Sequence, residues 1–177
     1  MEIKLIEQKP LTTLAVRETA SGAELPRVIS AGFARVYDYI VKTGAQIIDA
    51  PYAAYINMAG DSWDIEIGFP VARETPENGS EVCVNQANSP DTNHPEQMST
   101  LIPKQHEIFP SVIPAGRAAA ALHKGSYAGL EAVYGELFKW VGDNGLKQSG
   151  APYDRYLNDP SVTPEDELLT NVVIPVI

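Results

Sequence analysis

The sequence predicts an α+β fold of two tandem β-α-β-β units with antiparallel sheets, pseudo-twofold symmetry and a ligand cleft between the units. Three observations support this: a short motif occurs twice, one helical pattern reappears at the same displacement, and similar strand patterns follow both copies. Repeat one spans about residues 1–73 and repeat two about 111–177, with a loop insert at about 74–110. We therefore expect the 177 residues to form one domain.

The repeated motif has the pattern Ala-Pro-Tyr-x-x-Tyr-aliphatic-Asn. It occupies residues 50–57 and again residues 151–158, a displacement of 101 positions. In each copy, the second tyrosine (Tyr55 or Tyr156) lies on the same strand face as the residue two positions before it, because side chains alternate along a strand. The motif therefore predicts two equivalent strands.

A helix with the same apolar spacing precedes each copy of the motif. Apolar side chains recur at i, i+4, i+7, i+8 and i+11, and each set ends on a glycine, Gly44 or Gly145, suited to the left-handed C′ position. This stripe is typical of a helix that packs on a core. Its members are Ile29, Phe33, Val36, Tyr37 and Ile40 in the first helix and Leu130, Tyr134, Leu137, Phe138 and Val141 in the second.

Strand patterns complete each unit. Residues 11–18 and 116–123 read as opening strands, while residues 64–71 and 169–176 alternate like half-buried strands and stop near a proline. The insert is rich in Pro, Asn, Ser, Glu and Gln and predicts a long loop. Within it, residues 82–84 and 101–102 are apolar enough for either a short hairpin or a lid.

The amino-acid composition limits the classes of binding partner and the cellular compartment that we expect. The net charge of −10 and the lack of any run of Lys or Arg disfavour direct nucleic-acid binding and are compatible with a cationic ligand. No stretch approaches the roughly 18 apolar residues of a membrane span, and the start of the chain does not resemble a signal peptide. A single cysteine, Cys83, fits a reducing compartment. We expect a cytoplasmic protein with no membrane partner.

The candidate ligand site lies on the inner strands beside the predicted cleft. Asp154 and Tyr156 share one strand face, and Tyr55 is the counterpart of Tyr156. Glu66 and Asn171 occupy equivalent positions in the closing strands, where Glu66 faces either solvent or the cleft. Aromatic walls with desolvated carboxylates suit a flat cation. Three aromatic residues of the helices complete the predicted ligand-binding set: Phe33, Tyr37 and Trp140.

Several segments resemble the GyrI-like small-molecule-binding domains, which also serve as effector domains of AraC-type and MerR-type multidrug-sensing activators. They are residues 64–71, 114–117, 123–127, 153–160, 164–170 and 174–176. The resemblance implies a duplicated β-α-β-β fold and a hydrophobic groove for cationic or planar aromatic compounds. Drug-sensing members anchor the cation with a buried glutamate in an E-x-Y-L-x-D-P strand; the matching residue here is Asp154, one methylene shorter. Many relatives carry an acidic residue where this chain has Asn171. The resemblance therefore makes Glu66 a more important candidate for the carboxylate of the ligand site.

The expected function is a stand-alone binding or sequestering protein for hydrophobic, cationic aromatic small molecules, without a DNA-binding segment. One alternative is hydrolysis of strained electrophilic natural products, with Glu66 or Asp154 as the carboxylate base. Another is a protein partner, as in a gyrase-binding modulator. Haem would require His94, His106 or His123 as an axial ligand, and His123 suits a turn-capping role better. We expect no cofactor and no metal site.

Overall fold

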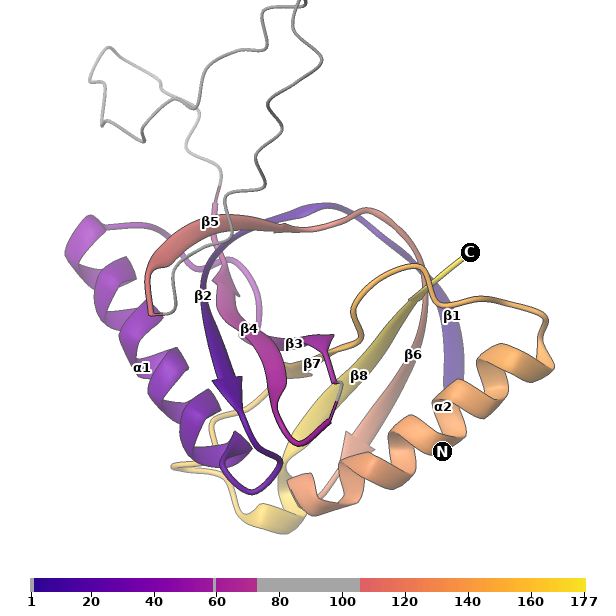
Figure 1. Cartoon of the computed structure of the whole chain (residues 1–177). Coiled ribbons are helices and arrows are strands. Elements are labelled where there is room, and N and C mark those ends of the chain that lie inside the picture. The colour runs from indigo at the N-terminus through magenta and orange to yellow at the C-terminus, as the bar shows by residue number, and fades with distance from the viewer. Residues whose placement is uncertain (1, 59, 73–105) are drawn as a thin grey trace, which may run out of the picture.

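The computed structural model describes residues 2–58, 60–72 and 106–177 (Figure 1). The insert segments at 82–84 and 101–102 therefore lie outside the described residues. The elements are β1 (Ile3–Gln8), β2 (Leu11–Ala20), α1 (Leu25–Thr43), β3 (Tyr52–Asn57), β4 (Trp63–Pro70), β5 (Ile108–Ile113), β6 (Gly116–Lys124), η1 (Tyr127–Gly129), α2 (Leu130–Asp143), β7 (Tyr153–Tyr156), η2 (Glu165–Glu167) and β8 (Leu169–Val176).

The strands form one sheet of eight in the order β1-β6-β8-β7-β3-β4-β2-β5. Every neighbouring pair is antiparallel. With α1 and α2 packed on this sheet, the predicted α+β class with antiparallel pairing is confirmed.

The two copies of the repeated motif pair with each other at the centre of the sheet. Ala53 of β3 lies opposite Asp154 of β7, and the pairing continues beyond the strands through two reciprocal hydrogen bonds. The Tyr55 N–H donates to the Pro152 carbonyl at 2.9 Å, and the Tyr156 N–H donates to the Pro51 carbonyl at 3.0 Å. Outward from this central pair, the strands follow in the order β8, β6, β1 on one side and β4, β2, β5 on the other. The predicted superposition of residues 11–71 on 115–176 stays a prediction.

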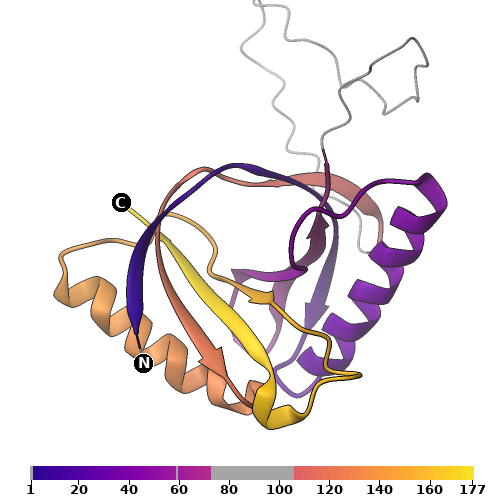
Figure 2. The same cartoon turned by 180° about the vertical axis from the view of Figure 1, so that it is seen from behind.

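Two strands were missed in the sequence, β1 and β5, and they change how the halves join. The sequence patterns predict an antiparallel sheet in each unit, and they place residues 108–110 in the insert. Instead, β1 pairs with β6 of the other half, and β5 pairs with β2. Gln8 lies opposite Gly116 and Leu11 opposite Ile113. The chain segments β1-β2 and β5-β6 thus run side by side as one long ribbon, which joins the two ends of the curled sheet (Figures 1 and 2).

Each helix covers one half of the same sheet face, which we call the helix face. α1 packs on β2 and β4, and α2 packs on β6 and β8 (Figure 1). Pro26 stands in the first turn of α1, and its predicted C-terminal glycine, Gly44, is left-handed at φ 74° and donates its N–H to the Ile40 carbonyl. Tyr37 and Phe138 are stripe members that stay exposed.

The opposite face of the sheet carries its own apolar cluster, which includes Tyr52, Ala54, Ile113 and Tyr153. Both faces of the central strands are therefore buried. In the described part of the chain, no helix has the length and apolarity needed to cross a bilayer.

Candidate ligand-binding site

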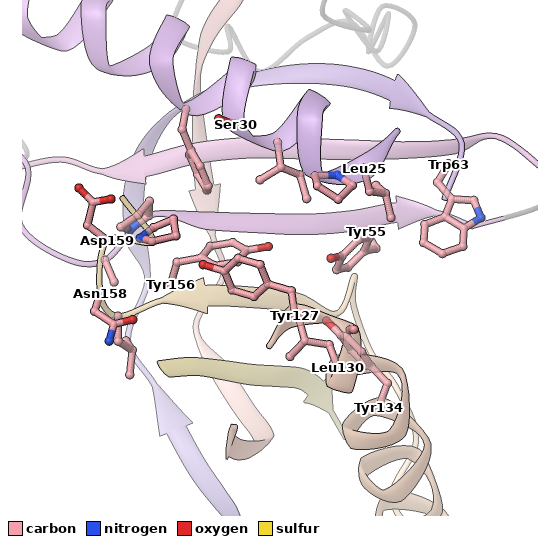
Figure 3. A pocket seen from close by; sticks show the side chains of 18 of the residues that line it. Leu25, Ser30, Tyr55, Trp63, Tyr127, Leu130, Tyr134, Tyr156, Asn158 and Asp159 are labelled. Atoms are coloured by element: carbon pink, nitrogen blue, oxygen red, sulfur yellow. The ribbon is translucent and has the colours of Figure 1, made fainter. Parts of the chain in front are cut away.

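A cavity of about 1670 Å³ lies between α1 and α2, above the central strands of the sheet (Figure 3). Its walls are mainly aromatic. The first half of the chain contributes Phe33, Tyr37, Tyr55, Trp63 and Phe69, and the second half contributes Tyr127, Tyr134, Phe138 and Tyr156. Such a concave apolar surface with few polar groups is the usual form of a small-molecule site.

A buried carboxylate lies beneath this cavity. Asp154 is 0% exposed, and the hydroxyls of two lining residues hold it: Tyr55 donates to Oδ2 at 2.8 Å and Tyr134 donates to Oδ1 at 2.8 Å. Asp154 is not itself part of the cavity lining, so its charge reaches the cavity through these two phenol groups. Both hydrogen bonds satisfy the carboxylate in a site that water does not reach.

Burial controls the ionisation of this cluster. It raises the pKa of Asp154 to about 6, although the hydrogen bonds from Tyr134 and Tyr55 and the charge of His123 favour the ionised form. Burial, followed by nearby groups that include Asp154, also raises the pKa of Tyr55 and Tyr134 well above the usual tyrosine range. At neutral pH, Asp154 is therefore mainly an anion beneath two neutral phenols.

Charged residues on the cavity lining have one sign. Asp49, Glu131 and Asp159 line it, and no lysine or arginine occurs among its described lining residues. Asp49 forms an ion pair with Arg155, whereas the Asp159 carboxylate accepts a 2.8 Å hydrogen bond from the Ser161 N–H. The field inside the cavity consequently favours a positive ligand.

The structure brings together some of the residues predicted from sequence. Tyr55, Tyr156, Phe33 and Tyr37 line the cavity, with Asp154 beneath them. Tyr156 and Phe33 are in direct ring contact, with centroids 5.5 Å apart at an interplanar angle of 79°.

The expectation that Glu66 and Asn171 face the same cleft is corrected by the strand register. Glu66 lies opposite Ala54, and Asn171 lies opposite Arg155, so both are one residue out of phase with Tyr55 and Asp154. Because successive side chains alternate between faces, both point to the opposite face of the sheet. The Glu66 carboxylate is 6% exposed and is held there by three donors, at 2.9 Å from Arg17 Nε, 2.8 Å from the Tyr52 hydroxyl and 2.9 Å from the Ser111 hydroxyl.

Trp140 is also outside the cavity. It packs at the edge of the core beneath α2, with Leu137 and Val141 nearby in that core cluster. Tyr134 and Phe138 are one helical turn apart and face the cavity, whereas Trp140 follows Phe138 by two residues, which turns it roughly 200° around the helix. Its predicted ligand contact is therefore corrected.

Sequence reasoning missed Tyr134, Tyr127 and Trp63. A signal for Tyr134 was present, because it is displaced by 101 positions from Phe33, which was assigned to the site. His123, weighed above as a haem ligand, donates its Nε2–H to the Ser126 carbonyl at 2.9 Å, in the turn before α2. Within residues 2–58, 60–72 and 106–177, no three His, Cys, Asp or Glu side chains gather where they could hold a metal ion.

The fold and this cavity define a small-molecule-binding domain of the α+β class. The chain belongs to the family of GyrI-like small molecule binding domains, whose family model matches residues 1–177. The resemblance found in the sequence is thus confirmed. A comparison with curated proteins gives no match.

Several solved structures share this fold. The C-terminal domain of EcmrR has 19% sequence identity and a TM-score of 0.72, over 99% of this chain and 97% of that one. This chain spans 57% of the EcmrR chain in a complex with DNA. SAV2435 bound to tetraphenylphosphonium has 13% identity and a TM-score of 0.58, over 100% and 94%. A hydrolase from Listeria innocua has 14% identity and a TM-score of 0.58, over 99% and 92%. At these identities the likeness shows a shared fold.

Proposed function

We propose that this domain reversibly binds, and so sequesters, hydrophobic cationic aromatic molecules in the cavity between α1 and α2. The observation that carries the proposal is the buried carboxylate of Asp154, held by Tyr55 and Tyr134 directly beneath an aromatic cavity.

Two attractions act together on a cation in this cavity. The faces of its aromatic side chains attract positive charge, and this attraction increases once the charge is desolvated. The Asp154 anion adds a longer-range attraction through a medium of low polarity.

Repulsion makes the site selective. An anionic aromatic compound would meet the Asp154 carboxylate and the lining residues Glu131 and Asp159, with no described lysine or arginine on the lining to attract it. The same negative charge, and the net charge of −10, argue against nucleic acid as a partner of this domain. The tetraphenylphosphonium in the solved structure of SAV2435 is a ligand of the proposed chemical class on the same fold.

A pair of ligands of matched shape and opposite charge tests the proposal. Tetraphenylphosphonium should bind and raise the melting temperature, because it binds the folded chain alone, whereas tetraphenylborate should do neither at the same concentration. Isothermal titration calorimetry measures both affinities. Equal binding of the two ions would show a purely hydrophobic cavity, and binding of neither would refute the proposal.

Hydrolysis in the same cavity is the second candidate function. A pKa of about 6 suits a general base near neutral pH, and a hydrolase from Listeria innocua shares the fold. Glu66 is unavailable for this role because it lies on the opposite face. Both oxygens of Asp154 already accept tyrosine protons, which favours binding over proton abstraction. Mass spectrometry of the recovered ligand separates the two functions, since a hydrolase would return a product heavier by one water.

A further inference from the structure

The rings in the cavity divide into two groups. Within the described residues, the centroid of Tyr55 lies 6.3 Å from that of Trp63 and 6.0 Å from that of Tyr134. We call Trp63, Tyr55, Tyr134 and Phe138 the Trp63 cluster. A second group centres on Phe33, whose ring lies 5.5 Å from those of both Phe69 and Tyr156. We call Phe33, Phe69, Tyr37, Tyr127 and Tyr156 the Phe33 cluster.

The labelled members of the two clusters lie on different sides of the cavity. Figure 3 shows Trp63 at one end and Asp159 with Asn158 at the other, with Tyr156 and Tyr127 on the side of Asp159. At about 1670 Å³ the cavity exceeds the 300–1,000 Å³ of a typical site for one drug-sized ligand.

Two carboxylates lie near the clusters. Asp154 accepts hydrogen bonds from Tyr55 and Tyr134 of the Trp63 cluster. Burial, followed by the charge of Asp154, also raises the pKa of Tyr156 in the Phe33 cluster. Asp159 lies next to the Phe33 cluster, near enough to the Tyr127 hydroxyl that its charge contributes to raising the pKa of that phenol. The first carboxylate is fully buried and the second is exposed at the rim.

The spacing of the two carboxylates limits the ligand. Asp154 and Asp159 are five residues apart on β7 and the segment after it, so their backbones are at most about 17 Å apart. Two cationic rings joined by a chain of that reach would place one ring in each cluster. We expect one compact cation to occupy a single cluster.

We propose that the cavity is a two-compartment site for elongated aromatic dications, with one ring in the Trp63 cluster above Asp154 and the other in the Phe33 cluster beside Asp159. This inference rests on the proposed function and specifies its ligand class. Once the first ring is bound, the linker holds the second near its compartment, which raises its effective concentration and hence the affinity.

Dequalinium, in which a decamethylene chain joins two aminoquinaldinium rings, is the test ligand. Its matched control is 1-decyl-4-aminoquinaldinium, which keeps one ring and the chain. Calorimetry should show one dequalinium per chain, bound at least tenfold more tightly than the control compound. Equal affinities, or two dequalinium molecules per chain, would overturn the proposal.

Variants in the Phe33 cluster locate the second ring. Tyr127→Leu should lower the ratio of dication to monocation affinity about fivefold, because it removes one aromatic face. Asp159→Asn, a surface change that spares the fold, should lower the same ratio roughly twofold to threefold. Asp166→Asn removes an exposed charge that is not on the cavity lining and should leave both affinities unchanged. If neither Tyr127→Leu nor Asp159→Asn changes this affinity ratio from its wild-type value, the proposed second compartment is wrong.

Failure of this inference can be told from failure of the proposed function. If tetraphenylphosphonium and the monocation bind but dequalinium is no tighter, the cavity is one undivided cation site and only the two-compartment proposal falls. If none of the three cations binds, the proposed function itself is wrong.

Discussion

The hydroxyl of Tyr134 on α2 donates a 2.8 Å hydrogen bond to Oδ1 of Asp154 on β7. This bond links a helix that forms one wall of the cavity to the carboxylate beneath its floor. Loss of the Asp154 charge, by substitution or by protonation, therefore acts on the cavity directly, and the first two predictions follow from it.

Asp154→Asn should weaken the binding of tetraphenylphosphonium and preserve the shape of the side chain. The lost attraction to a desolvated charge is on the order of 1–3 kcal/mol, about 5-fold to 150-fold in affinity. Isothermal titration calorimetry at neutral pH measures the change. A neutral planar aromatic compound should bind both proteins equally, and an unchanged phosphonium affinity would show that the cavity acts through its rings alone.

Cation affinity should fall as the pH drops through about 6, the value to which burial raises the pKa of Asp154. Protonation removes the negative charge, so at pH 5 the affinity should be about fourfold to tenfold lower than at pH 7.5. The hydrogen bonds of Asp159 with Ser161 lower its pKa, so this rim group titrates below that range. Calorimetry across the pH range gives the midpoint.

Tyr134→Phe is the matched variant for this pH dependence. The variant keeps the ring but lacks the hydroxyl that donates to Asp154. In the wild-type protein, that hydrogen bond lowers the pKa of Asp154. The midpoint of the affinity curve should consequently move to higher pH, while Asp154→Asn should abolish the curve. A midpoint that stays in place would assign the pH dependence to another group.

Folding stability should depend on pH in the opposite direction. Because the folded pKa of Asp154 is raised from about 3.8 to about 6, the unfolded chain ionises first. The free energy of unfolding should therefore fall by an amount on the order of 3 kcal/mol between pH 4 and pH 6, and remain lower above that range. Urea denaturation of the wild type and of Asp154→Asn isolates this contribution, since the variant lacks it. Parallel curves for the two proteins would contradict the prediction.

Glu66→Gln should reduce stability and spare ligand binding. Glu66 lies on the opposite face, where it accepts hydrogen bonds from Arg17, Tyr52 and Ser111. Without its charge, the half-buried Arg17 loses its ion-pair partner, at a cost of about 1–3 kcal/mol. Urea denaturation and phosphonium titration of the same sample test both halves of the prediction. A loss of phosphonium affinity in a fully folded variant would place Glu66 in the site after all.

Local sequence patterns predicted most of the elements correctly. The period of the apolar residues gave both helices, and alternation with terminal prolines gave β4 and β8. β5 was not predicted. Residues 108–113 contain a proline and follow the polar insert, so no alternation of apolar and polar residues marks where the strand begins. The partners of β1 and β5 lie in the other half of the chain, and a local pattern does not encode such pairing.

The sequence by itself determined the α+β class, the paired motifs around Tyr55 and Tyr156, and Asp154 as the carboxylate beside them. Those features depend on the types of residues and on their spacing over short stretches of the chain, and both can be read from the sequence. The tertiary structure alone decided which face each side chain occupies. A shift of one residue in register moves a side chain across the sheet, so Glu66 and Asn171 could be assigned to the wrong face while Asp154 was assigned to the right one. The positions of Tyr127 and Trp63 likewise depended on how η1 and β4 pack around the cavity.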